Sequence, residues 1–333
     1  MGYKTVSIEK SPVLEATLEK ANAYQPIFKN KVQSIADKLG LEVEHGPVKT
    51  FETGFKKARN DYGGDVSKIP DINRSVVFVK SLDNIGSELK KIVALAKQEF
   101  GGTTRIKMGI GTPSYNKVLV NVKTPHGIGE IQVTTKNMWD VKMKGGGDVL
   151  YGLARNKRTP ENIVKAIQTR MEELYQVNPK SPFLKSSKYA REGGFTMDLI
   201  RNIEFSGTPH IAVSPFPERT MIVGKEGVTP KVLADFLEKN KDIYLNPKNK
   251  GLVSGGWFDE KSGFGGLDIT IPVPKEMATE AKNLGVKGNQ IAGWNLEKFE
   301  EIKYDGTGKV EGTAPLIERW KLVEEILAKI NKL

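Results

Sequence analysis

The sequence has no cysteine and only three histidines among its 333 residues. The lack of cysteine excludes a disulfide scaffold, thiol catalysis, thiolate zinc sites and iron–sulfur clusters. With only His45, His126 and His210, a metal site built from several histidines is not expected. Carboxylates are therefore the side chains to examine for metal chemistry.

Long apolar runs are also missing. No segment approaches the roughly 18 consecutive apolar residues that a membrane-spanning helix needs, so we expect no membrane partner. Residues 1–10 contain no apolar stretch of the kind found in a secretory signal. We therefore expect the protein to act in the cytoplasm of the cell that makes or receives it.

Positive charge is abundant. Lysine and arginine number 51 against 40 acidic residues, which gives a formal net charge of +11. A surplus of this size favours anionic partners such as nucleotides, RNA or phosphate-rich surfaces, although solvated lysine-rich surfaces are also common. Apolar residues make up 38% of the chain, enough for packed cores, and the length indicates about two domains.

The first half alternates between helical and strand-like patterns. Residues 1–44 are expected to form a helical segment, because apolar side chains recur every three or four residues before Gly40. Further on, residues 83–100 have a helical stripe. Strand-like segments follow at 75–80, 105–110, 117–123 and 128–135. The order predicts an α/β (α+β) fold, in which a mixed sheet with flanking helices occupies residues 45–175.

A segment rich in Pro, Ser, Lys and Gly, residues 176–195, is predicted to be a linker. Residues 196–333 are then a second α+β domain that ends in an amphipathic helix over 315–332. Within it, residues 257–271 have the pattern of a hairpin. Trp257 and Trp294 are expected in its core rather than as ligand platforms.

Two carboxylates lie near strands of the first domain. In GIGEIQVT, strand alternation places Glu130, Gln132 and Thr134 on one face and the apolar residues on the other. Asp71 precedes another strand, in PDINRSVVFV. Two carboxylates from different strands suit Mg²⁺, which prefers oxygen ligands and shares them with substrate phosphates. Asp71 as a turn cap and Glu130 as the partner of a lysine remain the alternative.

A basic segment precedes these strands, with three lysines and an arginine between Lys49 and Arg59. If it is helical, Lys49, Thr53 and Lys56 lie near one face and can hold a triphosphate; a solvated lysine-rich helix has the same composition. Tyr115, on the loop before residues 117–123, can stack on a base or be a half-buried loop residue.

The order of these motifs resembles the synthetase domain of the RelA/SpoT family, which are nucleotide pyrophosphokinases of nucleotidyltransferase-like fold. The resemblance covers about 110 residues, over roughly 45–155, and is closest to the compact versions found in toxins and phages. The segments that carry it are KTFETGFKK, PDINRSVVFV, SYNKVLVNVK, EIQVTT and NMWDVKMKGGGDVLYGLAR.

The resemblance implies transfer of pyrophosphate from ATP–Mg²⁺ to a hydroxyl of a nucleotide or of the 3′ end of tRNA. Asp71 and Glu130 are then the catalytic and Mg²⁺-binding pair, with Glu130 as second metal ligand or as general base. The residues implied in nucleotide binding are Lys49, Thr53, Lys56, Lys57, Arg74, Tyr115, Lys117 and Gln132.

This chain departs from the family pattern at several positions. Thr50 and Thr53 replace serines, Asn73 replaces a glycine, and no arginine follows Gln132. These differences leave the acceptor open among GDP or GTP, adenine nucleotides and tRNA. They also leave a second interpretation: an inactive phage structural or docking protein that only binds nucleotide or nucleic acid. The C-terminal half resembles an uncharacterised module of large phage and prophage proteins. The likeness carries over no activity and leaves three roles open: a substrate-recognition domain, a virion or docking domain for a phage or host protein partner, or a neutralising domain.

Overall fold

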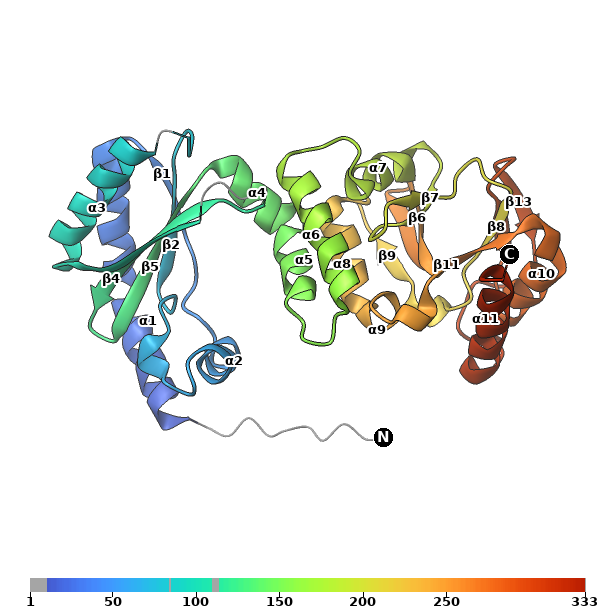
Figure 1. Cartoon of the computed structure of the whole chain (residues 1–333), viewed down its shortest axis with the longest axis horizontal. Coiled ribbons are helices and arrows are strands. Elements are labelled where there is room, and N and C mark those ends of the chain that lie inside the picture. The colour runs from blue at the N-terminus through green and yellow to red at the C-terminus, as the bar shows by residue number, and fades with distance from the viewer. Residues whose placement is uncertain (1–10, 84, 110–113, 333) are drawn as a thin grey trace. The chain divides into compact units, whose positions relative to one another are not determined.

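The computed structural model describes residues 11–83, 85–109 and 114–332, and the chain divides into two compact units, Met1–Trp139 and Asp140–Leu333. Both units combine helices with a β-sheet, as Figure 1 shows. The predicted α+β class is confirmed. Each unit is described by itself.

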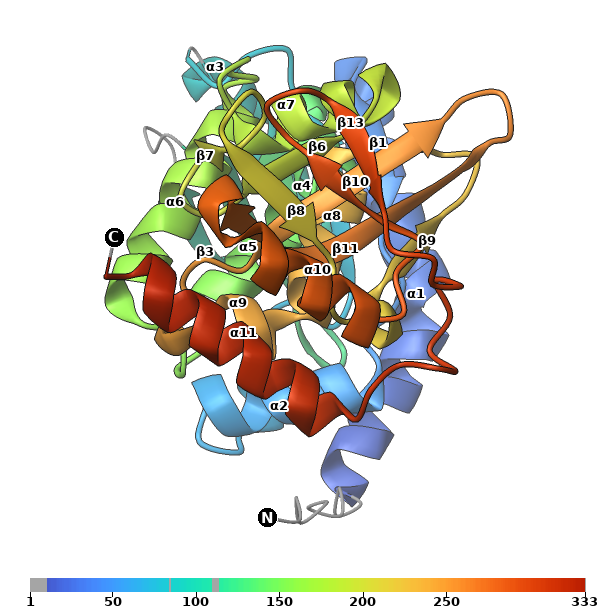
Figure 2. The same ribbon diagram turned by 90° about the vertical axis from the view of Figure 1, so that its right-hand side faces the viewer.

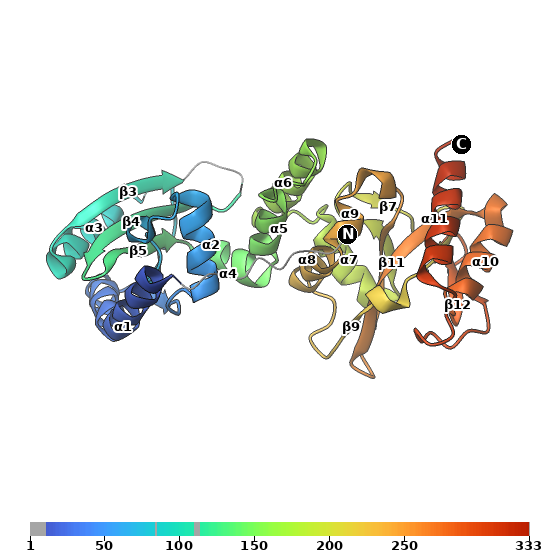
Figure 3. The ribbon, with the colours of Figure 1, turned by 90° about the horizontal axis from the view of Figure 1, so that it is seen from below.

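The first unit is built on a five-stranded mixed sheet in the order β1-β2-β5-β4-β3. Strands β2 and β5 are parallel, and every other pair is antiparallel. The strands β3, β4 and β5 lie side by side in Figure 3. Its elements are α1 (Pro12–Leu39), β1 (Glu42–His45), α2 (Phe51–Asp61), β2 (Arg74–Phe78), α3 (Gly86–Phe100), β3 (Thr103–Gly109), β4 (Lys117–Thr124) and β5 (Gly127–Thr134). The division between the two units falls within the next helix, α4 (Lys136–Lys144).

Helices α1 and α3 cover one face of this sheet (Figure 1). Strand alternation aims the apolar side chains of β2, β4 and β5 at these helices, and the resulting core is fully buried. Phe28 of α1 and Phe100 of α3 contact each other there, with ring centroids 5.5 Å apart. The polar side chains of β5 consequently project from the other face.

A second, smaller core positions α2. It contains Leu14 and Leu18 of α1, Ala58 of α2, and Ile69 and Ile72 from the segment before β2. The helix begins where the side chain of its N-cap residue accepts a hydrogen bond from the backbone of the first turn. This packing fixes which residues of α2 face the sheet.

Gly129 lies where the sheet and α1 come closest. A Cβ at this position would lie 2.6 Å from Cε2 of Phe28. We expect Gly129→Ala to lower the free energy of unfolding by about 1–3 kcal/mol, because the core must shift to make room. Chemical denaturation measures this. Gly86→Ala is the matched control, since Gly86 is exposed and a Cβ there would contact no atom within 4 Å; equal losses in both variants would contradict the prediction.

The second unit contains an eight-stranded sheet in the order β13-β12-β8-β11-β10-β6-β7, with β9 paired to β11. Its strands are β6 (Phe195–Asp198), β7 (Ile203–Glu204), β8 (His210–Val213), β9 (Met221–Val223), β10 (Val253–Asp259), β11 (Phe264–Pro274), β12 (Ala292–Asn295) and β13 (Glu300–Lys303). Strands β10 and β11 form the predicted hairpin.

The helices of this unit are α5 (Gly147–Ala154), α6 (Glu161–Tyr175), α7 (Pro182–Tyr189), α8 (Pro230–Lys239), α9 (Lys241–Tyr244), α10 (Ala278–Lys287) and α11 (Leu316–Ile330). The C-terminal helix α11 lies against α10, as Figure 2 shows, and buries Val323 and Leu327. In the part of the chain that the structure describes, no helix has both the length and the apolar character required to cross a membrane.

The structure differs from the predicted domain boundary. The division between the units follows Trp139, whereas the predicted linker, residues 176–195, lies inside the second unit. That segment contains helix α7, in which Phe183 is completely buried. Its composition is typical of a linker, but its few apolar residues are enough to anchor it in a core.

Candidate active site

The polar face of β5 carries the first part of the candidate site. Glu130 and Gln132 are both buried, and the Gln132 amide donates a 2.7 Å hydrogen bond to the Glu130 carboxylate. Thr134 donates to the backbone carbonyl of Asn116 at 2.7 Å. The alternation predicted for this strand therefore holds, and it places an acid within the sheet where water has little access.

Asp71 is the centre of a second cluster. Its Oδ2 atom lies 3.1 Å from Nζ of Lys49 and 2.8 Å from Nζ of Lys57. The two residues Ile69 and Ile72 are buried in the core beside it and hold the loop in place. The other oxygen, Oδ1, is buried and has no hydrogen-bond partner. The carboxylate is thus held on one side by two cations and left with one unused acceptor.

The start of α2 decides which lysines reach Asp71. Lys49 precedes the helix and is fixed by a backbone hydrogen bond to Ile72, while Lys57 projects from the helix itself. Lys56 is exposed and pairs with Glu52 at 2.5 Å. The predicted shared face of Lys49, Thr53 and Lys56 is therefore not formed.

Thr53 has a local role in the structure. Its hydroxyl hydrogen-bonds to the side chain and to the backbone carbonyl of Thr50, the N-cap residue of α2. Replacement of serine by threonine at both positions preserves hydroxyl groups that can make these capping contacts. Thr53 contributes to the start of the helix, and the structure does not bring it to the carboxylates.

Tyr115 and Lys117 join the polar face from the chain leading into β4. The Tyr115 hydroxyl donates to Oε1 of Gln132 at 3.3 Å. Nζ of Lys117 lies 5.2 Å from the centroid of the Tyr115 ring. Arg74 is the register neighbour of Glu130 on the parallel strand β2, so both side chains project from the same face of the sheet.

Asn121 was not identified from the sequence. It is the antiparallel neighbour of Glu130 on β4, and it is buried with an unpartnered Oδ1 atom. An asparagine among valines, at the same strand parity as Lys117, was the signal that could have revealed it. Two of the unpartnered buried oxygens among the described residues, those of Asp71 and Asn121, therefore belong to this region.

The environments of the two carboxylates push their pKa values apart. Burial alone would raise the pKa of Asp71, but the ammonium groups of Lys49 and Lys57 outweigh it and hold the pKa below its usual value. Burial raises the pKa of Glu130, and the negative charge of Asp71 adds to this, against the opposing effects of the Gln132 hydrogen bond, Lys117 and Lys57. One carboxylate is poised to stay charged and the other to accept a proton.

The residues present fit Mg²⁺ bound together with a phosphate-bearing substrate. Among the described residues, no three histidine or acidic side chains converge as a metal cage. Mg²⁺ is commonly held by only one or two carboxylates and completes its shell with water and substrate phosphates. The buried, unpartnered Oδ1 of Asp71 is a suitable first ligand.

The fold and the site agree with the resemblance that the sequence motifs carry. A mixed sheet carries, on its polar face, an acid with raised pKa beside a lysine-bound aspartate, in the motif order of RelA/SpoT-like synthetases. Sequence comparison confirms this resemblance. The chain is 33% identical over 129 residues to the (p)ppApp synthetase toxin Tas1 of Pseudomonas aeruginosa, a match that covers 36% of this chain and 27% of the relative. The chain thus spans about a quarter of the length of that relative.

Two solved structures are also similar. One is the complex of the Type VI effector Tas1 with its immunity protein, at 24% identity and TM-score 0.37, covering 49% of this chain and 94% of that one. The other is the small alarmone synthetase 1 of Bacillus subtilis bound to its product pppGpp, at 18% identity and TM-score 0.38, covering 50% and 93%. No family model matches the chain.

Proposed function

We propose that the first unit is an ATP-dependent pyrophosphokinase. The observation that carries the proposal is the pair of carboxylates with opposite pKa shifts, Asp71 and Glu130, in a chain similar to a synthetase of this kind. In the reaction, an acceptor hydroxyl forms a bond to the β-phosphorus of ATP. The bond from that phosphorus to the bridging α–β oxygen breaks, AMP leaves with this oxygen, and the hydroxyl proton passes to Glu130.

The side chains of the site have two kinds of proposed role: some neutralise the charge of the phosphates, and others position the reacting groups. Lys49 and Lys57 hold the triphosphate, and Lys117 and Arg74 add positive charge on the same face of the sheet. Asp71 is the metal ligand; Mg²⁺, when bound, supplies neutralisation of the charge that develops on the phosphates. Glu130 receives the proton. Because phosphoryl transfer needs little covalent chemistry from the protein, this preorganised charge accounts for most of the rate.

The acceptor is proposed to be an adenosine nucleotide. The relative is a (p)ppApp synthetase, and Tyr115 offers an aromatic face on which a purine can stack. Guanosine nucleotides and the 3′ end of tRNA are the competing acceptors. The proposal extends to a toxin role, because the relative is a toxin: the chain would consume ATP in the cytoplasm of a target cell. A protein like the immunity protein that binds Tas1 would be its neutralising partner.

The direct test is incubation of the full chain with ATP, Mg²⁺ and each candidate acceptor. We expect AMP and a pyrophosphorylated adenosine nucleotide in equal amounts, and none of either when Mg²⁺ is removed with a chelator. Formation of the product with a guanosine nucleotide only would overturn the acceptor assignment. ATP binding without any AMP would favour the second candidate, an inactive nucleotide-binding docking protein.

The two adjacent lysines of α2 provide a matched pair of variants. We expect Lys57→Ala to lower kcat/KM for ATP by about tenfold or more, because a hydrogen bond to a charged group contributes about 1.5–3 kcal/mol. Lys56→Ala removes the same charge from the same helix but points away from Asp71. Steady-state kinetics of both variants measure the difference; equal losses would mean that only the general positive charge matters.

The rate is expected to depend on pH through Glu130. A base must be deprotonated, so kcat rises as pH increases through the pKa of this group and is lost below it. Since the pKa of Glu130 is raised by burial, that rise should fall above the usual range of a glutamate. A pH profile of kcat measured with saturating ATP and Mg²⁺ tests this. A profile that is flat from the ordinary glutamate pKa upwards would contradict the role.

A further inference from the structure

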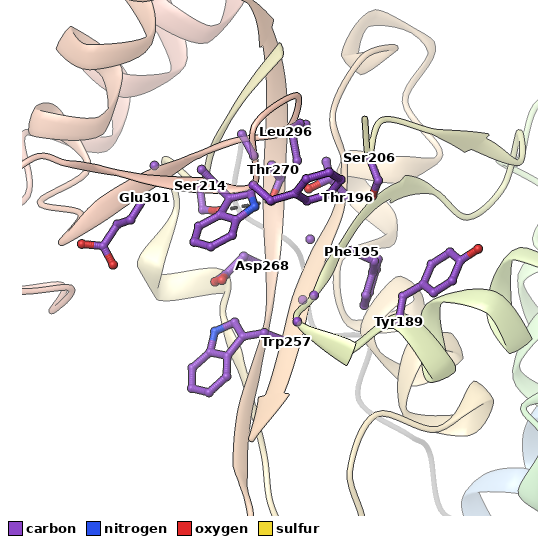
Figure 4. A pocket seen from close by; sticks show the side chains of 18 of the residues that line it. Tyr189, Phe195, Thr196, Ser206, Ser214, Trp257, Asp268, Thr270, Leu296 and Glu301 are labelled. Carbon is purple, nitrogen blue, oxygen red and sulfur yellow. Dashed lines mark hydrogen bonds between the residues drawn. The ribbon is translucent and has the colours of Figure 1, made fainter. Parts of the chain in front are cut away.

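The second unit contains a cavity of about 840 Å³ on one face of its sheet. Its wall includes Gly255 and Trp257 of β10 and Asp268 and Thr270 of β11, which are alternate residues on neighbouring strands. Figure 4 shows the Asp268 carboxylate directed into the same space as the indole of Trp257. The volume is typical of sites for small molecules or for a short peptide segment.

Small residues make this part of the sheet hollow. The cavity is lined at its base by Gly255 and Gly256, and by Ala212 of β8 and Ala292 of β12. A Cβ at Gly255 would lie 2.4 Å from Oγ1 of Thr270, so no larger residue fits there without displacement. The large side chains stand around the hollow instead of filling it.

Aromatic side chains form its exposed walls. Trp257 and Trp294 are 42% and 39% exposed, although the sequence predicted them in the core. Trp294 pairs in register with Ala212 and Glu301, which also line the cavity. Exposed tryptophan faces carry negative charge density in the ring centre and attract cations.

The charge of the cavity is opposite to that of the chain. Its described lining residues include the acids Glu192, Glu204, Asp268 and Glu301 and no lysine, arginine or histidine, whereas the whole chain has a net charge of +11. Lys188 and Lys185 lie 3.7 Å from Glu192 and Glu204, respectively, and balance them. The carboxylates of the other two acids, Asp268 and Glu301, are then the ones available to a ligand.

Asp268 is held in position by its neighbours. The hydroxyl of Thr220 donates a hydrogen bond to its Oδ1 atom. Burial raises the pKa of Asp268 against the effect of this hydrogen bond, and no cation among the described residues contributes to that pKa. A positively charged group placed in the cavity stabilises the charged carboxylate.

We propose that this cavity binds an organic cation, an amine or guanidinium group carried on an apolar body. The cationic group pairs with Asp268 while its carbon chain lies against Trp257 and Trp294. The same chemistry is presented by a free amine and by an arginine or lysine side chain of a peptide. Phosphorylated ligands do not fit, because the described lining offers no cation to receive them. This proposal is independent of the function proposed for the first unit.

Titration calorimetry on the full chain tests the proposal with four probes. N-acetylarginine methylamide represents a peptide side chain and agmatine represents a free amine. The citrulline counterpart of the first probe replaces guanidinium by a neutral urea of nearly the same shape, and N-acetylaspartate methylamide is the anionic control, which is not a nucleotide and so is no ligand of the site proposed in the first unit. We expect saturable binding of at least one cation and no binding of the citrulline or aspartate probes. Whichever of the two cations binds more tightly shows whether the site prefers a peptide side chain or a free amine.

Variants assign the binding to this cavity. We expect Asp268→Asn to weaken cation binding by about tenfold or more, since it removes the charge and keeps the shape. Trp257→Leu should weaken it too, and this position is exposed, so folding is preserved. Glu260→Gln, in the exposed turn of the same hairpin, should leave the affinity within about twofold. The proposal is overturned if neither cation binds at millimolar concentration, if citrulline binds as well as arginine, or if Asp268→Asn and Trp257→Leu both retain full affinity.

Discussion

Glu130→Gln is expected to lower the rate of pyrophosphoryl transfer by about 10²- to 10⁴-fold, the range that a general base contributes. The amide has the same shape and can still accept the hydrogen bond from Gln132. It cannot take a proton from the acceptor hydroxyl. Single-turnover measurement of AMP release, with ATP and acceptor both saturating, gives the rate of the chemical step.

The same variant has a second readout that separates catalysis from folding. Because burial raises the pKa of Glu130, its charged form destabilises the native state at neutral pH, and that destabilisation grows as pH rises through the native pKa. Glu130→Gln should therefore unfold at a slightly higher temperature than the wild type at neutral pH, and bind ATP with similar affinity. Full activity in this variant would show that the carboxylate is structural.

Asp71→Asn is expected to lower the activity by about 10³-fold or more for a different reason, the loss of a metal ligand and not of a base. A metal ion contributes several kcal/mol to charge stabilisation. Unlike Glu130→Gln, Asp71→Asn should also weaken Mg²⁺-dependent ATP binding, because it removes the proposed metal ligand. Calorimetry with a non-hydrolysable ATP analogue, with and without Mg²⁺, measures this. Mg²⁺-dependent binding equal to that of the wild type would exclude Asp71 as a ligand.

A second substitution controls for misfolding. Asp71→Asn leaves Lys49 and Lys57 facing each other without their counter-ion, and an uncompensated buried charge destabilises a protein. Adding Lys57→Met removes one of these charges while keeping the length of the side chain. We expect the double variant to regain thermal stability and to remain far less active than Lys57→Met alone, which lacks the same lysine but keeps Asp71. Recovery of activity to the level of Lys57→Met, together with stability, would mean that Asp71 acts only through folding.

The sequence predicted the sheet of the first unit well, because its signals are local. Alternation in β5 identified the face that carries Glu130, and the turn residues between β4 and β5 identified the hairpin. The register that places Asn121 beside Glu130 depends on contacts between strands. No periodicity within one strand reveals which residue lies opposite on the next.

The lysines of α2 show how a small displacement in a helix start changes a site. The spacing of Lys49, Thr53 and Lys56 predicts a common face only if the helix includes all three. The N-cap at Thr50 begins the helix after Lys49, and packing of α2 on α1 turns Lys57 towards Asp71. That orientation is set by tertiary contacts between distant segments, which the composition of the stretch does not contain.

The two tryptophans of the second unit also show that a sequence pattern does not predict which face of a strand is buried. Large aromatic residues in strands usually pack in a core, and the sequence predicted this for Trp257 and Trp294. The opposite face of the sheet is the filled one: Leu267 and Ile269 of β11, the strand next to that of Trp257, are buried on it. Which face of a strand is covered depends on where the helices of the unit dock.

The ion pairs of Asp71 have a consequence for substrate binding. Lys49 and Lys57 neutralise this carboxylate, and they are also the groups proposed to receive the triphosphate. When ATP draws the two ammonium groups towards its phosphates, the negative charge of Asp71 is no longer balanced by them and attracts Mg²⁺ more strongly. By thermodynamic linkage, bound Mg²⁺ must favour ATP by the same factor. We therefore expect the nucleotide and the ion to bind cooperatively, so that the unit responds to the concentration of their complex more steeply than to either component alone.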